Sequence, residues 1–480
     1  MDLGDYRERV ERFIGELELE YVLHLSGRKP TFDIEPIYER HADLFERGAV
    51  EAMREAAPRE LARFAVEGHI GQATKAEAAE IARLEATLTV ALDGTEMPYR
   101  QTTIAQANEP DPERRAAIED ARLRVMEEAL NPLYVEAHER SAAIARELGW
   151  SSTLAMCEEL GALDLLDLDR QCQAFLKATD GWYADVMNPE LERELGFGLD
   201  RLRRSDIGAY MRAPSFDSAF PSDRLVPAYE LTLAGLGLDG GGVRIDLEER
   251  PNKTPRAFCA PVRVPDEVHL VMAPVGGRED YEILFHEAGH AQHYSRVARE
   301  LPVEARYLGD NSVTEGFAFV FQHLVASPDW LAAMLDVDER RELVRHSRAT
   351  RLLMIRRYCG KLLYETELHS GVLPAGEAPR AYAALLEAAV GVDWPAASWL
   401  TDVDPFFYAA RYLRAWAFET HLRAVLRERF GPHWFVEREA GALLQSLWRE
   451  GQARGADELL GELTGDRLDL ASVARDLAPA

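Results

Sequence analysis

The chain lacks the features that mark several large classes of protein. Its 480 residues include only four cysteines and no CxxC pair, so neither a disulfide framework nor a cysteine zinc module is expected, and the thiols are predicted to be buried and reduced. No run of about 18 apolar residues occurs, so no membrane-spanning helix is predicted. The N-terminal stretch is charged and has no apolar signal segment. We therefore expect a cytoplasmic protein.

Positive charge is also scarce. Lysine and arginine number 55 against 83 acidic residues, which gives a net charge of -28. This balance argues against binding to nucleic acid or to an anionic membrane. The glycine run 240–242 is not followed by the Lys-Ser/Thr of a phosphate-binding loop, and no Ser/His/Asp or Cys/His triad stands out. Hydrophobic residues make up 47% of the chain, enough for a large core.

Sequence patterns typical of helices are abundant in the first 200 residues. Residues 1–200 are rich in Ala, Glu, Leu and Arg, with apolar residues at helical spacing, as in Ile81, Leu84, Leu88 and Leu92. Helix breaks are predicted near residues 27–30, 108–112 and 149–152, and a helix start is predicted at Asp111-Pro112. The fold is therefore predicted to be mainly α.

The pattern changes beyond residue 235. Short apolar runs at 243–246, 257–260 and 268–272 are separated by proline and charged residues, which predicts a small antiparallel sheet over about residues 243–274. Gly276-Gly277 closes this segment, and helices are predicted from Glu279 to the end of the chain.

A metal-binding motif follows the predicted sheet. His286-Glu287-Ala288-Gly289-His290 has the form HExxH. Residues i and i+4 of a helix lie on one face, so His286 and His290 can bind the same ion. Glu287 lies beside them, where it can take a proton from water, while Ala288 and Gly289 keep the helix narrow. The motif predicts a hydrolase with one Zn²⁺ per chain, although such sites also accept Mn²⁺ or Co²⁺.

Catalytic zinc needs a third protein ligand and an open position for water. Glu315, 25 residues after the second histidine, is the preferred candidate. Asn311, Ser312 or Thr314 can cap a helix that places Glu315 in its first turn. Apolar residues follow, so this helix is expected to be buried and its carboxylate to need a positive partner. His293 is a rival ligand, but it would compete on a crowded face, and we favour a supporting or packing role.

These residues resemble the thimet oligopeptidase and oligoendopeptidase F family of HExxH zinc peptidases, which is related to gluzincins such as angiotensin-converting enzyme. The segment from Asp246 to Lys253, followed by 257–259, is similar to the D-x3-R-x2-K and AFC segments of that family, with Arg256 where the family has glycine. The run 301–303 (Leu-Pro-Val) occurs in the converting-enzyme relatives, whose glutamate spacing is one residue shorter. The likeness is strongest over residues 244–330.

The resemblance implies a two-lobed helical metallopeptidase with a deep central channel that admits short peptides. On this basis we expect a helical lobe over residues 1–200, packed over the channel. Residues 201–480 would form the catalytic lobe, with the small sheet and the C-terminal helices.

A tyrosine-bearing segment near residue 410 is the expected source of an oxyanion donor. Tyr408 and Tyr412 stand at i and i+4, and the resemblance places a transition-state tyrosine in this region. Tyr412 is preferred, because an Arg-Tyr pair such as Arg411-Tyr412 occurs in the converting-enzyme relatives, and Tyr408 is second. The alternative is an aromatic stripe packed in the core. The family usually has a substrate-contacting histidine upstream, whereas residues 399–404 contain none.

The sequence thus predicts an oligopeptidase in which Glu287 activates water on zinc held by His286, His290 and Glu315. A metallocarboxypeptidase of the same clan would use the same zinc site, but it needs a cation for the substrate carboxylate. The available cations are Arg351, Arg356, Arg357, Lys361 and Arg411. The motif is also compatible with a zinc hydrolase of another small amide, and with a non-catalytic metal-stabilised binding protein, although such a protein has no need of Glu287.

Overall fold

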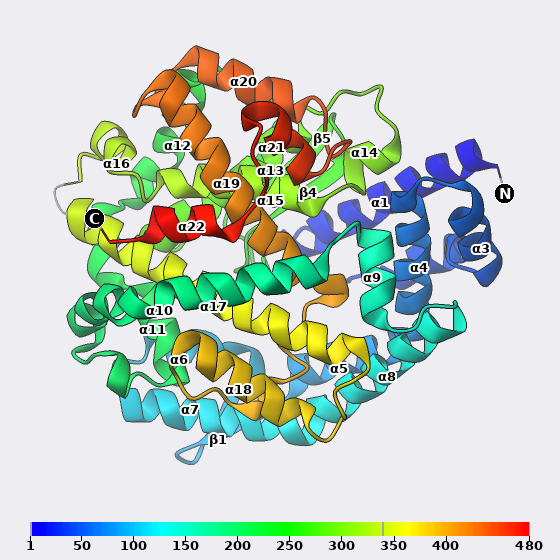
Figure 1. Ribbon diagram of the computed structural model, residues 1–480, viewed down its shortest axis with the longest axis horizontal. Coiled ribbons are helices and arrows are strands. Elements are labelled where there is room, and N and C mark those ends of the chain that lie inside the picture. The colour runs from blue at the N-terminus through cyan, green and yellow to red at the C-terminus, as the bar shows by residue number, and fades with distance from the viewer. Residues whose placement is uncertain (1, 338–339, 480) are drawn as a thin grey trace. The chain divides into compact units, whose positions relative to one another are not determined.

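The computed structural model describes residues 2–337 and 340–479, and it is mainly α-helical (Figure 1). The chain forms two compact units, each assembled from separate stretches. Unit 1 comprises residues 1–68, 214–344 and 411–473, and unit 2 comprises residues 69–213, 345–410 and 474–480. In the described residues no helix is both long enough and apolar enough to span a membrane.

Unit 1 contains the three-stranded sheet and the helices around it. Its helices are α1 (Leu3–Leu25), α2 (Glu35–Arg40), α3 (Arg47–Ala56), most of α4 (Arg59–Ala73), α12 (Leu225–Gly235), α13 (Arg278–Tyr294), α14 (Val303–Tyr307), α15 (Asn311–Leu324), α16 (Pro328–Met334), most of α19 (Tyr408–Phe430), α20 (Arg438–Trp448) and α21 (Ala456–Thr464).

The sheet of unit 1 lies where the sequence predicts it. Its strands are β3 (Val243–Asp246), β4 (Phe258–Arg263) and β5 (Glu267–Val271), in the order β3-β5-β4. The prediction of a purely antiparallel sheet was wrong, because β3 pairs parallel with β5 and only β4 pairs antiparallel. The chain from Asp246 to Phe258 leads past the place of β5, so β4 starts one strand position beyond it. The antiparallel turn from β4 then brings β5 between the two strands and parallel to β3.

Helix α1 packs along the edge strand β4. Val22 forms a buried cluster with Ala260 and Val262. About two turns earlier, a Cβ added at Gly15 would lie 3.0 Å from the carbonyl oxygen of Val262, so the helix approaches the strand closely. The N-terminal helix is therefore part of the wall around the segment that leads to the HExxH motif.

The segment that carries the family likeness forms an ionic clamp at the end of β3. Buried Asp246 accepts hydrogen bonds from Arg250 (2.9 Å), Lys253 (3.1 Å) and Arg28 (2.8 Å). Arg250 also donates to the carbonyl oxygen of Ser26 (2.9 Å). Burial alone would raise the pKa of Asp246, but Arg250 and Lys253 hold it below its usual value. The clamp fixes the segment after β3 to the end of α1.

Unit 2 is built mostly of long helices. Its elements are α5 (Lys75–Thr87), β1 (Thr89–Leu92), β2 (Thr95–Pro98), α6 (Thr102–Asn108), α7 (Pro112–Val125), α8 (Asn131–Glu147), α9 (Thr153–Gly161), α10 (Leu165–Leu195), α11 (Ile207–Arg212), most of α17 (Arg340–Ser370) and α18 (Ala378–Val390). Helix α7 begins at Pro112, as predicted, and the carboxylate of Asp111 caps it by accepting the amide hydrogen of Glu113. Helix α22 (Leu470–Leu477) contributes residues to both units.

One stretch of unit 2 departs from its predicted helix. Leu88 and Leu92 were assigned to a helix by spacing, but α5 ends at Thr87 and β1 and β2 form an antiparallel hairpin. Asp93 and Gly94 at the turn have φ of 53° and 76°. An Asp-Gly turn with two positive φ values matches the twist of paired strands, and this local preference outweighed the helical spacing.

Candidate metal centre

The candidate centre is built on the contact between α13 and α15 in unit 1. Helix α13 carries His286, Glu287 and His290, and α15 carries Glu315. A Cβ at Gly289 would lie 2.5 Å from the Cα of Ala318 and 2.7 Å from the carbonyl oxygen of Phe317. Only glycine lets the two backbones approach this closely. The glycine of the motif therefore sets the distance between the helices that bear the candidate ligands.

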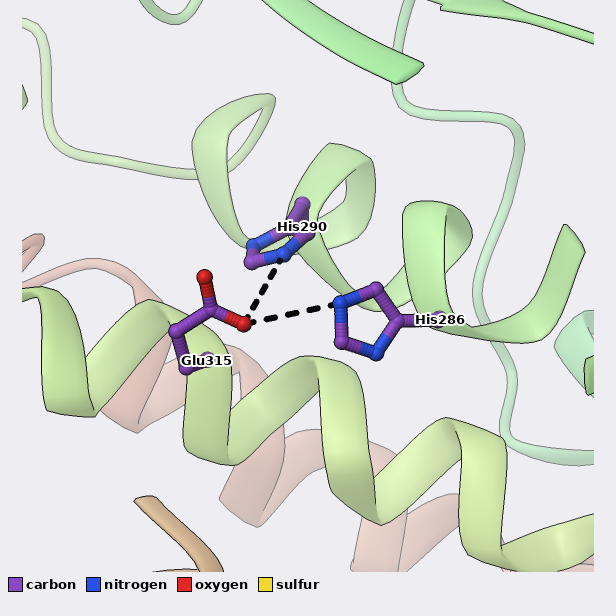
Figure 2. Close-up of side chains that lie close together, drawn as sticks. All are labelled: His286, His290 and Glu315. Carbon is purple, nitrogen blue, oxygen red and sulfur yellow. Dashed lines mark ion pairs between the residues drawn. The ribbon is translucent and has the colours of Figure 1, made fainter. Parts of the chain in front are cut away.

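The structure brings the three predicted ligands together (Figure 2). The Nε2 atoms of His286 and His290 each lie 3.5 Å from one carboxylate oxygen of Glu315. Two ligand atoms at ~2.1 Å from one tetrahedral zinc ion are separated by ~3.4 Å. Two imidazoles and one carboxylate are a donor set that zinc takes in hydrolases, so the residues present fit the metal.

Both histidines are oriented by side chains of the opposite helix. The Nδ1 of His286 lies 2.9 Å from the Oε1 of Gln322, and the Nδ1 of His290 lies 2.9 Å from the hydroxyl oxygen of Thr314. A hydrogen bond at Nδ1 fixes the ring and leaves Nε2 to bind metal. Helix α15 therefore supplies Glu315 and a support for each histidine.

The electrostatics of the group suit a cation. Burial alone would raise the pKa of Glu315, yet the two histidines hold it well below its usual value. Burial alone would lower the pKa of His290, yet Glu315 raises it. The carboxylate thus stays ionised in a largely buried place. The side chains of His286 and His290 remain 19% and 12% exposed, so one side of the group is open to water or a small ligand.

Helix α15 begins at Asn311, at least one residue earlier than predicted, and its cap is different. The carboxylate of Asp310 accepts the amide hydrogen of Ser312 and caps the helix, whereas the sequence favoured Asn311, Ser312 or Thr314. Glu315 is consequently the fifth helical residue rather than a first-turn residue. It is only 4% exposed, so it is not the exposed glutamate that would serve a helix dipole.

Asp310 also ties α15 to α19. It pairs with Arg411 at 2.7 Å and with Arg414 at 3.2 Å. Burial alone would raise the pKa of Asp310, but Arg411 and Arg414 hold it far below its usual value. The ionised Asp310 therefore fixes the start of α15, which bears Glu315, to Arg411, the residue next to Tyr412.

The two predicted tyrosines belong to different units. Tyr412 belongs to unit 1 and is partly exposed. Its ring lies 6.1 Å from that of Phe319 on α15, which in turn lies 5.2 Å from the ring of His286. Tyr408 is also partly exposed and belongs to unit 2. Tyr412 is therefore linked to the candidate centre through a single aromatic ring, while its role as an oxyanion donor stays a prediction.

His293 lies apart from the three-residue group. It is fully buried, stacks on Tyr294 at 5.3 Å and contacts Phe317 edge-on at 5.0 Å. Burial lowers its pKa to about 3, so the ring is neutral at physiological pH. This environment agrees with the packing role that the sequence favoured.

The five cations considered for a substrate carboxylate all have acidic partners in the described residues. The pairs are Arg411–Asp310, Arg351–Asp476, Arg356–Asp180, Arg357–Asp402 and Lys361–Asp404. A cation already held by a carboxylate is a poor anchor for a second one. This distribution of charge gives no support to a carboxypeptidase.

Sequence reasoning missed the two residues that support the histidines, as well as the cap. Thr314 was considered only as a cap, and Gln322 and Asp310 were not considered. The available signal was the spacing from Glu315 along one helix, since Gln322, seven positions on, lies on the same face. Thr314, one position before, lies about 100° around the axis, so spacing gave no signal for it. The signal for Gln322 becomes specific only when the face of α15 that meets α13 is known.

Comparison with known proteins finds similarity in structure alone. No protein-family model and no curated protein matches the chain. Among solved structures, a proposed oligoendopeptidase F from Bacillus anthracis str. Ames matches 99% of this chain and 95% of its own with a TM-score of 0.64. The two chains share 13% sequence identity. The likeness establishes that the chain has the helical fold of that protein.

Proposed function

We propose that the protein is a zinc-dependent metallopeptidase that hydrolyses peptide bonds of short peptides. The observation that carries the proposal is the convergence of His286, His290 and Glu315 beside the partly exposed Glu287. A structural metal site needs no adjacent carboxylate, whereas a hydrolytic one does. The description of the structural neighbour as an oligoendopeptidase F supports peptides as the substrate.

Each residue has a defined part in the proposed reaction. His286, His290 and Glu315 would hold zinc, which when bound supplies the Lewis acidity that polarises the scissile carbonyl and acidifies the attacking water. Glu287 takes a proton from that water while the oxygen of the water bonds to the carbonyl carbon. Glu287 then passes the proton to the amide nitrogen as the C–N bond breaks. Tyr412 donates a hydrogen bond to the carbonyl oxygen as negative charge builds there.

The test combines metal analysis with a digest. The purified protein should contain about one zinc per chain, and a peptide library treated with it should show internal cuts by mass spectrometry. The variant Glu287→Gln should keep its zinc and lose at least ~100-fold in rate, since a general base contributes at least that much. Glu279→Gln is the matched control, because Glu279 is an exposed glutamate of the same helix, and it should behave like the wild type.

Different outcomes would point to a different function. Stepwise loss of C-terminal residues would identify a carboxypeptidase. Zinc at full occupancy with no cleavage of any peptide would favour another amide substrate or a binding protein. A fully active protein without metal, or normal turnover by the Glu287→Gln variant, would contradict the proposal.

A further inference from the structure

Three aromatic side chains of unit 1 gather beside the candidate metal centre. The ring of Phe319 on α15 lies 5.2 Å from the ring of His286, and it stacks on the ring of Trp416 of α19 at 5.2 Å with an interplanar angle of 16°. The ring of Tyr412, one turn before Trp416, lies 6.1 Å from that of Phe319 and 6.3 Å from that of Trp416. Phe319, Tyr412 and Trp416 together form the aromatic cluster, which adjoins a candidate metal ligand through a direct ring contact.

The aromatic cluster is incompletely buried. Phe319 and Tyr412 are partly exposed, as is the candidate ligand His286. By contrast Phe317, two residues before Phe319 on the same helix, is fully buried in the core. Apolar ring surface in contact with water is unfavourable, and here it lies next to the open side of the candidate centre. The cluster therefore offers apolar surface that a molecule bound at the centre can cover.

The chemistry of the aromatic cluster favours a neutral, apolar occupant. The acidic residue of α19 closest in sequence to Trp416 is Glu419, which is 1% exposed and accepts a hydrogen bond from Arg423 at 2.6 Å. Its charge is therefore already paired. A charged side chain placed against the rings would lose water without gaining a partner. An aromatic side chain instead buries its own surface and packs edge-on or offset against the rings.

We propose that Phe319, Tyr412 and Trp416 form a subsite for an aromatic or large aliphatic side chain next to the scissile bond of the peptide substrate. This inference rests on the proposed peptidase function. Consecutive Cα atoms of a peptide are about 3.8 Å apart, so the two residues that flank a bond held at His286 are the ones whose side chains reach Phe319. The ring of Tyr412 lines the subsite, and its hydroxyl stays directed to the reacting carbonyl.

The experiment compares peptides that differ at one position. A library digest gives the cut sites, and aromatic or large aliphatic residues should be enriched on one side of the cut. Synthetic peptides then carry phenylalanine, leucine, alanine or lysine at that position. Zinc-loaded wild type should cleave the phenylalanine peptide with a kcat/KM roughly 10- to 100-fold higher than the alanine peptide, the effect of burying an aromatic side chain. Enrichment on neither side, or a preference for lysine over phenylalanine and leucine, overturns the proposal.

The variants decide whether the aromatic cluster is responsible. Phe319→Gln keeps a side chain of similar length but removes the ring, and it should bring the ratio of kcat/KM for the phenylalanine and alanine peptides close to one. Phe319→Leu keeps most of the apolar surface and should retain part of the ratio. Phe32→Ala removes an exposed phenylalanine of unit 1 whose ring contacts Tyr21 and His24, and it should leave the ratio unchanged. Damage to the metal centre alone would slow cleavage of both peptides equally, so a ratio that survives Phe319→Gln contradicts the proposal.

Binding separates this inference from the proposed function. Calorimetry with the zinc-loaded Glu287→Gln variant measures affinity, without turnover, for short peptides that carry phenylalanine or alanine at each position in turn. At one position phenylalanine should bind roughly 10- to 100-fold more tightly, and adding Phe319→Gln should remove the difference. If this holds while the wild type cleaves nothing, the subsite stands and the peptidase proposal fails. If cleavage occurs without a preference at any position, the peptidase stands and the subsite fails. If neither cleavage nor selective binding occurs, both fail.

Discussion

Replacing Gly289 by alanine tests whether the α13–α15 contact sets the geometry of the centre. The new Cβ would lie 2.5 Å from the Cα of Ala318, whereas ordinary contacts begin at 3.4 Å. Helix α15 would have to retreat by about 1 Å, since the obstacle is backbone and has no rotamer to change. Glu315 lies three residues before Ala318 on the same helix and would retreat with it.

Two opposing effects set the size of the change in stability. Alanine gains about 1 kcal/mol over glycine in a helix interior, whereas overpacking costs about 1 to 3 kcal/mol or more. A net loss of up to about 2 kcal/mol is expected. Metal sites tolerate displacements of only about 0.2 Å, so zinc affinity should fall at least ~10-fold. Competition with a chelator measures the affinity, and chemical denaturation of the metal-free protein measures the stability.

A second glycine provides the control. Gly181 lies inside α10, is exposed, and has no heavy atom within 4 Å of an added Cβ. Gly181→Ala should therefore be neutral or stabilising by up to about 1 kcal/mol, with unchanged zinc affinity. If Gly289→Ala binds zinc like the wild type and is as stable as Gly181→Ala, the close contact does not position the ligands.

Three more residues can be tested by substitution. Thr314→Val removes the hydroxyl that supports His290 and should weaken zinc binding about 10- to 100-fold by chelator competition, whereas Thr314→Ser should restore it. Asp310→Ala removes a helix cap and leaves Arg411 buried without this carboxylate, so the free energy of unfolding measured by denaturation should fall by about 3 to 5 kcal/mol. A fall of less than about 1 kcal/mol would show that the Asp310–Arg411 pair does not stabilise the start of α15. The folded-state pKa of Glu18 is raised from 4.5 to about 7, so this group destabilises the fold progressively as pH rises between those values. Glu18→Gln should consequently gain stability relative to the wild type at pH 8, by up to about 3 kcal/mol, and gain nothing near pH 4; an equal gain at both pH values would refute the assignment.

The sequence predicted the parts of the fold that local pattern controls. The helical class, the position of the sheet and the start of α7 at Asp111-Pro112 follow from periodicity and from the preference of proline for the first turn of a helix. The hairpin at 89–98 was missed because Leu88 and Leu92 happen to continue a helical spacing, although Asp93-Gly94 was a turn signal. The parallel pairing of β3 with β5 depends on the path of a long connection, which local pattern does not encode.

In the candidate centre, too, the sequence predicted the features set by local pattern and missed those set by tertiary packing. An HExxH helix places His286 and His290 on one face by geometry alone, and the apolar residues after Glu315 indicated burial. The supports from Gln322 and Thr314 depend on how α15 is rotated against α13, and that rotation follows from tertiary packing. The choice of Asp310 as cap was equally hidden, because Asp, Asn and Ser cap almost equally well.

Helix α15 carries Glu315, Thr314 and Gln322 and meets α13 at the glycine contact. These three side chains therefore move as one rigid body relative to the histidines. A shift of one residue along the axis, about 1.5 Å, would break all three contacts together. The three contacts cannot be altered one at a time. Substitutions that keep the centre must therefore preserve the alignment of α13 with α15. Most other positions are free of that constraint.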